Sequence, residues 1–311
     1  IASINWAEQV AYENGCQYII CAGDFFDKPN LTQDEITALR EIKWAPMYAH
    51  YFLVGNHESE EIDLKYSSTK ALEDTNRFVI SEPKIFQEPG FELAFLPYIT
   101  ESQRKPLADY FPEMKPGMPR YLFSHNDLVG IQLGPVVSMV GFNPADLAAM
   151  STLCINGHLH NGQRINDKVI NLGNLTGKDF GEDSTRYKHN VAIIDTDTAK
   201  IYFIENPFAF NFYKIEIMSN NNLEKLKHLK NNAVVSVQCS ADLLTAVKDI
   251  IASQKNIVDS RVIIKHNGTG EAVTADIMDL SVDQYVKFAE CCREKLDNTE
   301  ILEQELAEIL K

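Results

Sequence analysis

The chain has 311 residues, of which 45% are apolar and 23% are charged. This is the composition of an ordinary globular protein, and it excludes a fibre or a disordered chain. The formal charge of −15 argues against broad non-specific attraction to nucleic acid, but it does not exclude a nuclease that meets phosphate through bound cations. At roughly 150 residues per domain, the length predicts about two domains.

The chain reads as a soluble protein of a reducing compartment. No apolar run is long enough for a membrane helix, and the first residues lack the basic start and apolar centre of a signal peptide. The six cysteines lie far apart and form no CxxC pair, so neither a disulfide framework nor a zinc knuckle is indicated. We therefore expect a cytoplasmic protein without a membrane partner.

The first two-thirds of the chain alternate helical and strand patterns. Helices are expected at 7–14, 32–43 and 68–75, and a capping box from Thr32 to Glu35 opens the second one. Strands are expected at 18–22, 51–54, 78–80, 84–86, 92–97, 121–123, 152–155, 169–171, 191–194 and 201–204. Parallel units early and antiparallel strands later predict one α/β domain over 1–210, with a two-sheet core flanked by helices.

The pattern changes near residue 211. Strands at 212–217, 234–237 and 261–265, with helices at 223–229 and 243–253, predict a small second α/β domain over 211–275. Residues 281–311 carry two apolar stripes at helical spacing. These stripes either cover the protein's own core or bind a partner.

Four expected strands end in polar clusters. The clusters are Gly23-Asp24-Phe25-Phe26-Asp27, Gly55-Asn56-His57-Glu58, Ser124-His125-Asn126-Asp127 and Asn156-Gly157-His158-Leu159-His160. Ligands in α/β folds bind outside the carboxyl ends of strands, so these clusters are expected to converge. Carboxylate, amide and imidazole groups without thiolate suit Mn, Fe or Zn in a catalytic site, and the glycines allow a close backbone approach. A single site that binds two metal ions is the simplest explanation of the four clusters.

The motifs Gly23-Asp24-x-x-Asp27, Gly55-Asn56-His57-Glu58, Ser124-His125-Asn126-Asp127 and Gly157-His158-x-His160 resemble those of the calcineurin-like metallophosphoesterases. Within that superfamily, the chain is similar to the SbcD-type DNA repair exonuclease subunit of bacteria and phages. The motif resemblance covers roughly residues 1–205, and beyond them it is one of layout only. It implies a two-sheet metallophosphoesterase sandwich, a small α/β capping domain and a C-terminal helical tail.

The resemblance also implies roles for the site residues. Asp24 would bridge two divalent metal ions, most plausibly Mn with Fe or Zn as alternatives. One ion would be bound by Asn56, His125 and His158, and the other by His160. His57 would be the catalytic histidine beside the scissile phosphate, with Asp27 next to it on the substrate side. Two cations held about 3.5–4 Å apart lower the pKa of a shared water towards neutrality, which fits hydrolysis.

One family motif is not found. The family begins with an Asp-x-His strand before the first helix, and nothing before Ala7 supplies it. Because Asp24 and His160 are both present, we expect that a few dozen residues precede Ile1 in the natural chain, rather than that half of one metal site has been lost.

The expected function is metal-dependent hydrolysis of DNA in recombination or repair, by an exonuclease with possible endonuclease activity. The resemblance implies an SbcC-type ATPase partner, a homodimer and the cytoplasm of a bacterial or phage-infected cell. Basic residues expected to contact DNA are Lys28, Arg104, Lys105, Arg164 and Lys178. The alternatives are a small-molecule or nucleotide phosphodiesterase or phosphatase, and a catalytically impaired docking subunit.

Overall fold

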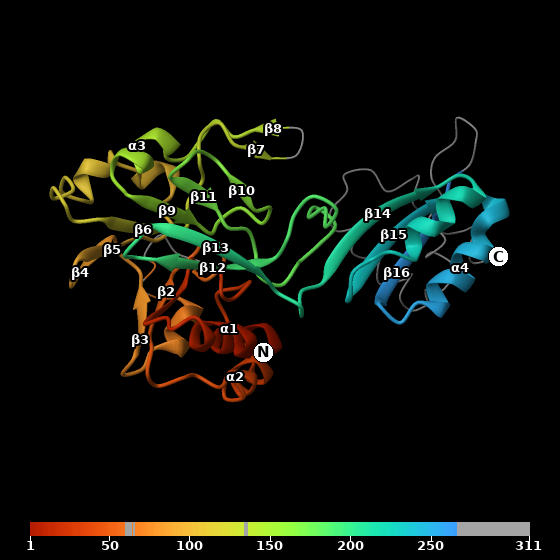
Figure 1. Ribbon diagram of the computed structural model, residues 1–311, viewed down its shortest axis with the longest axis horizontal. Helices are drawn as coiled ribbons and strands as arrows, with labels where there is room; N and C mark the ends of the chain where they lie inside the picture. The colour runs from red at the N-terminus through yellow and green to blue at the C-terminus, as the bar shows by residue number, and fades with distance from the viewer. Residues whose placement is uncertain (60–63, 65, 134–135, 266–311) are drawn as a thin grey trace, which may run out of the picture. The chain divides into compact units, whose positions relative to one another are not determined.

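The computed structural model of the chain describes residues 1–59, 64, 66–133 and 136–265. They form a mixed α/β protein with several sheets and few helices (Figure 1). The chain divides into two compact units, the first of Ile1–Tyr213 with Lys230–Ala233, and the second starting at Lys214. The predicted helices of residues 281–311 lie outside the described residues. In the described part of the chain, no helix is long and apolar enough to cross a bilayer.

The first unit begins with a three-stranded parallel sheet. Its strands are β1 (Tyr18–Cys21), β2 (Ala49–Leu53) and β3 (Arg77–Ile80), in that spatial order. Helix α1 (Ala2–Glu13) precedes β1, and α2 (Gln33–Leu39) connects β1 to β2. The capping box is confirmed, because the Glu35 amide donates to the Thr32 hydroxyl and the Thr32 amide donates to the Glu35 carboxylate.

Three predicted helices are wrong in extent or type. Helix α2 ends at Leu39, four residues before the predicted end, because the next three amides bond to carbonyls three residues back, as in a 3₁₀ turn. The predicted helix at 68–75 is the short 3₁₀ helix η1 (Ser68–Leu72), since the turn from Asp74 to Arg77 follows at once. Helix α1 starts at Ala2, five residues earlier than predicted.

The second sheet of this unit has six strands in the order β10-β11-β9-β6-β5-β4. Its strands are β4 (Lys84–Glu88), β5 (Phe91–Leu96), β6 (Arg120–Ser124), β9 (Leu153–Asn156), β10 (Gln163–Arg164) and β11 (Val169–Asn171). The inner neighbours pair in parallel and the two edge strands pair antiparallel. The parallel carboxyl ends of β6 and β9 therefore lie at the same edge of the sheet.

Alternate residues of β5 show how the layers pack. Phe95 belongs to a buried cluster that also contains Leu53 of β2, so the two sheets face each other across it. Leu96 points to the opposite face and packs in a second cluster with Leu147 of α3 (Pro144–Ala149). The three-stranded and the six-stranded sheet thus share one buried cluster, and α3 covers the second cluster as a helix that the sequence analysis missed.

Shorter elements complete the first unit. They are the hairpins β7 (Gln132–Leu133) with β8 (Val136–Val137) and β12 (Asn190–Asp195) with β13 (Lys200–Glu205), and the 3₁₀ helices η2 (Glu101–Gln103) and η3 (Leu107–Asp109). Strands β12 and β13 were predicted, at 191–194 and 201–204. Strands β7, β8 and β10 were not, because two residues are too few to show an alternating pattern.

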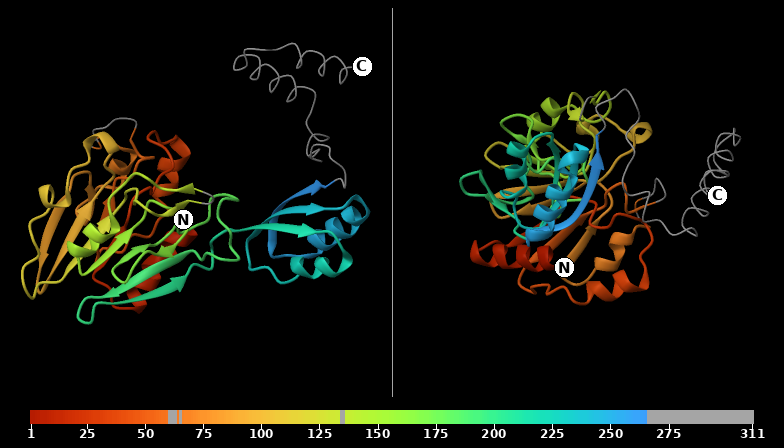
Figure 2. Two further views of the ribbon diagram at one scale, coloured as in Figure 1. Left: turned by 90° about the horizontal axis from the view of Figure 1, so that it is seen from above. Right: turned by 90° about the vertical axis from the view of Figure 1, so that its right-hand side faces the viewer.

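The second unit has one three-stranded sheet in the order β14-β15-β16. Its elements are β14 (Asn211–Ile217), η4 (Asn220–Leu226), β15 (Ala233–Cys239), η5 (Ala241–Leu243), α4 (Leu244–Ser253) and β16 (Ile257–Ile264). Helix α4 lies against this sheet and buries Val247 (Figure 2). The predicted helix at 223–229 is the 3₁₀ helix η4, and the third strand starts at Ile257 instead of Arg261. A capping role for this unit stays a prediction.

Candidate metal centre

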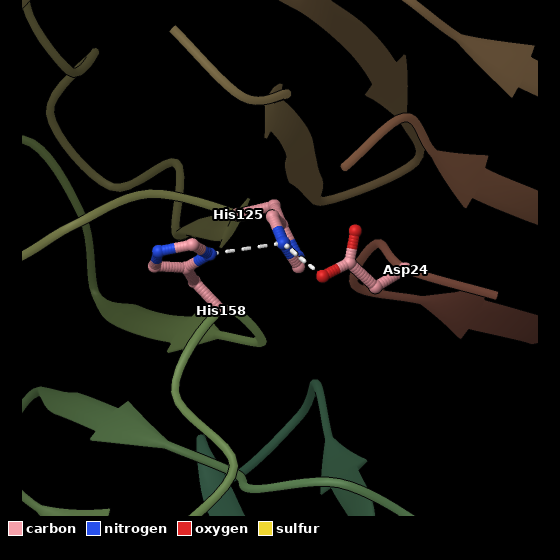
Figure 3. A group of neighbouring side chains, drawn as sticks. All are labelled: Asp24, His125 and His158. Atoms are coloured by element: carbon pink, nitrogen blue, oxygen red, sulfur yellow. Dashed lines mark hydrogen bonds and ion pairs between the residues drawn. The ribbon is translucent and has the colours of Figure 1, made fainter. Parts of the chain in front are cut away.

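Three side chains from three strand ends converge in the first unit. Asp24 follows β1, His125 follows β6 and His158 follows β9. Figure 3 shows His125 between the other two, with its Nε2 3.1 Å from Asp24 Oδ2 and 3.1 Å from His158 Nδ1. Asn56 Oδ1, after β2, lies 3.2 Å from the same Nε2. The structure thus brings together the four residues that the resemblance assigns to one metal ion.

Hydrogen bonds behind the two imidazoles determine which ring nitrogen faces the cluster. His125 Nδ1 lies 2.7 Å from the Ala22 carbonyl oxygen, which can only accept, so Nδ1 carries the proton. His158 Nε2 lies 3.1 Å from Asp127 Oδ1 and donates in the same way. Each neutral ring therefore turns a lone pair towards the cluster, where a carboxylate and an amide oxygen also point. Four converging lone pairs with no donor among them fit a cation, and this donor set suits a transition metal.

Glycine is required at two positions around Asp24 by close packing. A Cβ on Gly23, whose φ is +101°, would lie 2.1 Å from His125 Nδ1. A Cβ on Gly55 would lie 2.1 Å from Asp24 Oδ1. Asp24 itself has a φ of 51°, in the left-handed region that few non-glycine residues adopt. The backbone here is held in a costly conformation, as is common at functional sites.

The carboxylate of the cluster, Asp24, and the carboxylate behind His158, Asp127, are both held in the ionised form. Burial raises the pKa of Asp24, but the neighbouring imidazoles of His125 and His57 and the hydrogen bond from the His57 amide outweigh that rise, so the pKa lies below its usual range. The hydrogen bond from His158 lowers the pKa of Asp127, although partial burial opposes it. Both groups are therefore ready to balance a bound cation at neutral pH.

Glu58 fixes the relative position of two of the converging loops. Its side chain is fully buried, and its carboxylate accepts from the Phe26 amide at 3.1 Å and from the Gly55 amide at 2.8 Å. Burial raises the pKa of Glu58, and the hydrogen bonds from the two backbone amides oppose that rise. The loop after β1 and the loop after β2 are thus tied together by one side chain.

His57 lies beside the cluster without being one of its four members. Its amide donates to Asp24 Oδ1 at 3.1 Å, and its ring Nε2 is 4.0 Å from Asp24 Oδ2. On the other side, His57 Nδ1 is 3.4 Å from Asp27 Oδ1, which in turn accepts from Lys178 Nζ at 2.5 Å. The predicted neighbours His57 and Asp27 therefore lie together, and Lys178 completes the group.

His160 is not a member of the converging group. Its Nδ1 lies 3.1 Å from Glu182 Oε1, a buried carboxylate that also accepts from the Asn174 amide group and from the backbone of Lys178. The hydrogen bond that the His160 ring donates to Glu182 raises the pKa of His160, and partial burial opposes that rise. The role of His160 as a ligand of a second ion stays a prediction.

Most of the basic residues expected to meet DNA already have acidic partners. The ion pairs are Lys28 with Glu35, Arg104 with Glu101, and Lys178 with Asp27. Arg164 donates to the backbone carbonyl of Asp167. Lys105 is exposed and makes no ion pair within the described residues. Of the five, Lys105 is therefore the one best suited to meet a phosphate.

The sequence analysis assigned no role to Asp127, Glu58 or Glu182. Asp127 and Glu58 did stand within the predicted clusters, so their position at strand ends was the signal that could have identified them. Glu182 lies 22 residues after His160 in a loop, and no local pattern marks it. Only the fold brings Glu182 to His160.

Two sheets that gather carboxylate, amide and imidazole ligands at their strand ends define a metal-binding α/β protein. Residues 2–194 match the family described as calcineurin-like phosphoesterase, which is more than half of the chain. The chain therefore belongs to the calcineurin-like phosphoesterase family, and it is a metal-dependent phosphoesterase. A comparison with curated proteins gave no match. The predicted superfamily is thus confirmed, and the SbcD type stays a prediction.

Proposed function

We propose that this phosphoesterase hydrolyses the phosphodiester bonds of DNA, as an exonuclease with endonuclease capacity that serves recombination or repair. The observation that carries the hydrolytic part is the convergence of four lone pairs beside His57. The proposal of a DNA substrate is supported by the second α/β unit beyond the matched residues 2–194, and by the resemblance to SbcD-type subunits.

Asp24, Asn56, His125 and His158 would hold one divalent ion, and Asp24 with His160 would contribute to a second. When bound, such ions polarise a phosphoryl oxygen and lower the pKa of a coordinated water. The protein's own part is to keep the two imidazoles in the right tautomer, through the Ala22 carbonyl and Asp127. Manganese is the proposed metal, with iron or zinc as the alternatives.

His57 is the proposed catalytic histidine. Asp27 faces its Nδ1 at 3.4 Å and so orients the ring, which leaves Nε2 on the side of Asp24. From there Nε2 can donate a proton to the leaving oxygen or stabilise charge on the phosphate, a contribution of about 10²–10⁴-fold for groups of this kind. Lys178 holds Asp27 in place and brings a positive charge to the same side.

The test is a Mn²⁺-dependent assay on linear and circular DNA, set beside a small phosphodiester such as bis(p-nitrophenyl) phosphate. The parent chain should degrade linear DNA, and chelation should abolish this activity. His158→Ala should lose metal and activity together, whereas the exposed His228→Ala should keep both. Hydrolysis of the small ester alone would replace the DNA proposal with a small-molecule phosphodiesterase. Metal binding without hydrolysis of either substrate would favour the docking subunit.

We also propose that residues 281–311 bind an SbcC-type ATPase and that the nuclease acts as a homodimer. The apolar stripes at helical spacing in this segment support a partner helix or coiled coil. Deleting 281–311 should leave Mn²⁺-dependent cleavage intact and abolish co-purification with the ATPase. Loss of the folded phosphoesterase unit on deletion would show instead that the segment covers the protein's own core. Sedimentation of the full chain tests the dimer.

A further inference from the structure

We infer that a cavity beside the metal centre binds the nucleobase next to the scissile phosphate. This inference rests on the proposed function and deepens it. The cavity has a volume of about 590 Å³ and belongs to the first unit. The residues that line it include Pro83, Pro97, Tyr98, Tyr110 and Lys105. The volume lies in the ordinary range for small-ligand sites.

Tyr98 connects the cavity to the metal centre. Tyr98 is one of the residues that line the cavity, and its ring packs on His158, with 5.8 Å between the ring centroids. A ligand whose phosphate lies at the cluster can therefore place its next group on the Tyr98 ring. Aromatic side chains in this position stack on bases without selecting their sequence, as a general nuclease requires.

The wall of the cavity is fixed to the loop that carries His125. Asn126, the next residue, is fully buried, and its side-chain amide donates to the Pro97 carbonyl at 2.9 Å. The side-chain oxygen of Asn126 accepts from the Ile99 amide, also at 2.9 Å. The segment that carries Tyr98 is thus held on both sides by a residue adjacent to a metal-facing histidine. Cavity and cluster therefore keep a constant spacing, which a substrate with a fixed distance between phosphate and base requires.

The chemistry of the walls favours a flat, neutral group over a phosphate inside the cavity. Glu82 lines it and would repel an anion, whereas Ser81 and Gln103 offer hydrogen-bonding groups for a base. Three of the lining residues are tied to one another, because the Tyr110 hydroxyl accepts from the Lys105 amide at 2.9 Å and donates to the Gln103 carbonyl at 3.2 Å. The exposed side chain of Lys105 is then available for the phosphate of the following nucleotide.

Equilibrium binding to the full chain in Mn²⁺ tests this inference with two probes, dAMP and 2-deoxyribose 5-phosphate, which differ only in the base. The parent should bind dAMP at least about fivefold more tightly, the lower end of the effect of base–aromatic stacking. Tyr98→Leu should lose this preference and Tyr98→Trp should keep it. Tyr12→Leu is the matched control, because Tyr12 is an exposed tyrosine on α1. Equal binding of the two probes by the parent, or an undiminished preference in Tyr98→Leu, would overturn the inference.

Lys105→Ala is a second variant that does not depend on how well Tyr98→Leu folds. It should weaken binding of a short single-stranded oligonucleotide in Ca²⁺ and reduce the slope of log affinity against log salt by roughly one. The exposed Lys200→Ala serves as its control. An unchanged affinity and slope would contradict the inference. Failure of the proposed function is a separate result, seen as absence of DNA cleavage in Mn²⁺, and the preference for dAMP is measured independently of cleavage.

Discussion

Strands β5 and β6 meet buried polar groups at both of their ends, and the two ends differ in how those groups are paired. At the amino ends, Glu92 and Arg120 are register partners, both almost completely buried, and Arg120 Nε donates to Glu92 Oε2 at 2.8 Å. The other carboxylate oxygen accepts from Gln87 at 2.7 Å. At the carboxyl end of β6, His125 Nε2 meets only acceptors.

This difference separates a scaffold pair from a ligand site on the same sheet. Each oxygen of Glu92 has a donor within the protein, so this carboxylate needs no cation from solution. The cluster at the carboxyl ends remains incomplete until a cation supplies the positive charge. Burial of polar groups alone therefore does not mark a functional site, whereas an excess of acceptors over donors does.

The largest expected effect is at the amino ends. Arg120→Met leaves Glu92 buried without its cation and should lower the free energy of unfolding by about 3–5 kcal/mol. Urea denaturation measures this loss. The double variant Glu92→Leu with Arg120→Met should recover most of it, because apolar replacements of a buried pair are often neutral. Manganese bound per folded molecule should not change, and a change would show that the two ends are coupled.

At the carboxyl ends, His57→Ala should separate chemistry from binding. Turnover is expected to fall by about 10²–10⁴-fold because a proton donor is removed, whereas metal content should be retained. Steady-state kinetics and elemental analysis of the same preparation measure the two quantities. The control is His228→Ala, at an exposed histidine of the second unit. Turnover within twofold of the parent would show that the assigned role is wrong.

Asp127→Asn sharpens the contrast between the two ends by altering one hydrogen bond behind His158. An amide can present a donor where the carboxylate accepts, so the tautomer with its lone pair towards the cluster is no longer enforced. Manganese affinity should weaken by about 10–100-fold, as measured by calorimetry. Asp109→Asn, at an exposed position in η3, should have no effect. Equal affinities in parent and Asp127→Asn would place this hydrogen bond outside the metal site.

The smallest effect is the acid dependence of the Glu92 pair. Burial raises the pKa of Glu92, but hydrogen bonds from Gln87 and Arg120 outweigh it, so the folded-state pKa lies below the ordinary 4.5. The resulting stability is present above that ordinary value and is lost as pH falls through the folded-state pKa. The difference in unfolding free energy between the parent and Glu92→Gln should therefore narrow as pH falls below about 4.5. A constant difference between pH 6 and pH 3 would contradict the pairing.

The sequence predicted the strands and the convergence of the site better than it predicted the contacts within the site. Strands β1, β6 and β9 were marked by apolar runs that stop at polar residues, and the rule for strand ends brought Asp24, His125 and His158 together. Lys178 and Asp27 are 151 residues apart, and their contact depends on the whole fold. The hydrogen bonds of Asn126 to Pro97 and Ile99 could not be predicted either, because they depend on where the segment after β5 lies.

Helix ends were the least predictable part of the fold. The apolar spacing continues past Leu39, yet α2 tightens into 3₁₀ turns ahead of Pro46. The spacing of apolar residues shows which face of a segment is buried. It does not show where the backbone hydrogen bonds change from the α to the 3₁₀ pattern. The family was readable from motifs because its chemistry needs particular residue types. The DNA substrate and the ATPase partner depend on surfaces that no short motif encodes, so they stay predictions.

The buried carboxylate of Glu58 has a consequence for evolution and for protein engineering. Because its two oxygens anchor the loops after β1 and β2 at the same time, neither loop can change its length or path without displacing the other. We therefore expect Gly23–Asp27 and Gly55–Glu58 to be inherited together, although 27 residues separate them in the chain. A designer who grafts this centre onto another scaffold must transplant both loops with their shared anchor, because either loop alone would bring its ligand without the means to position it.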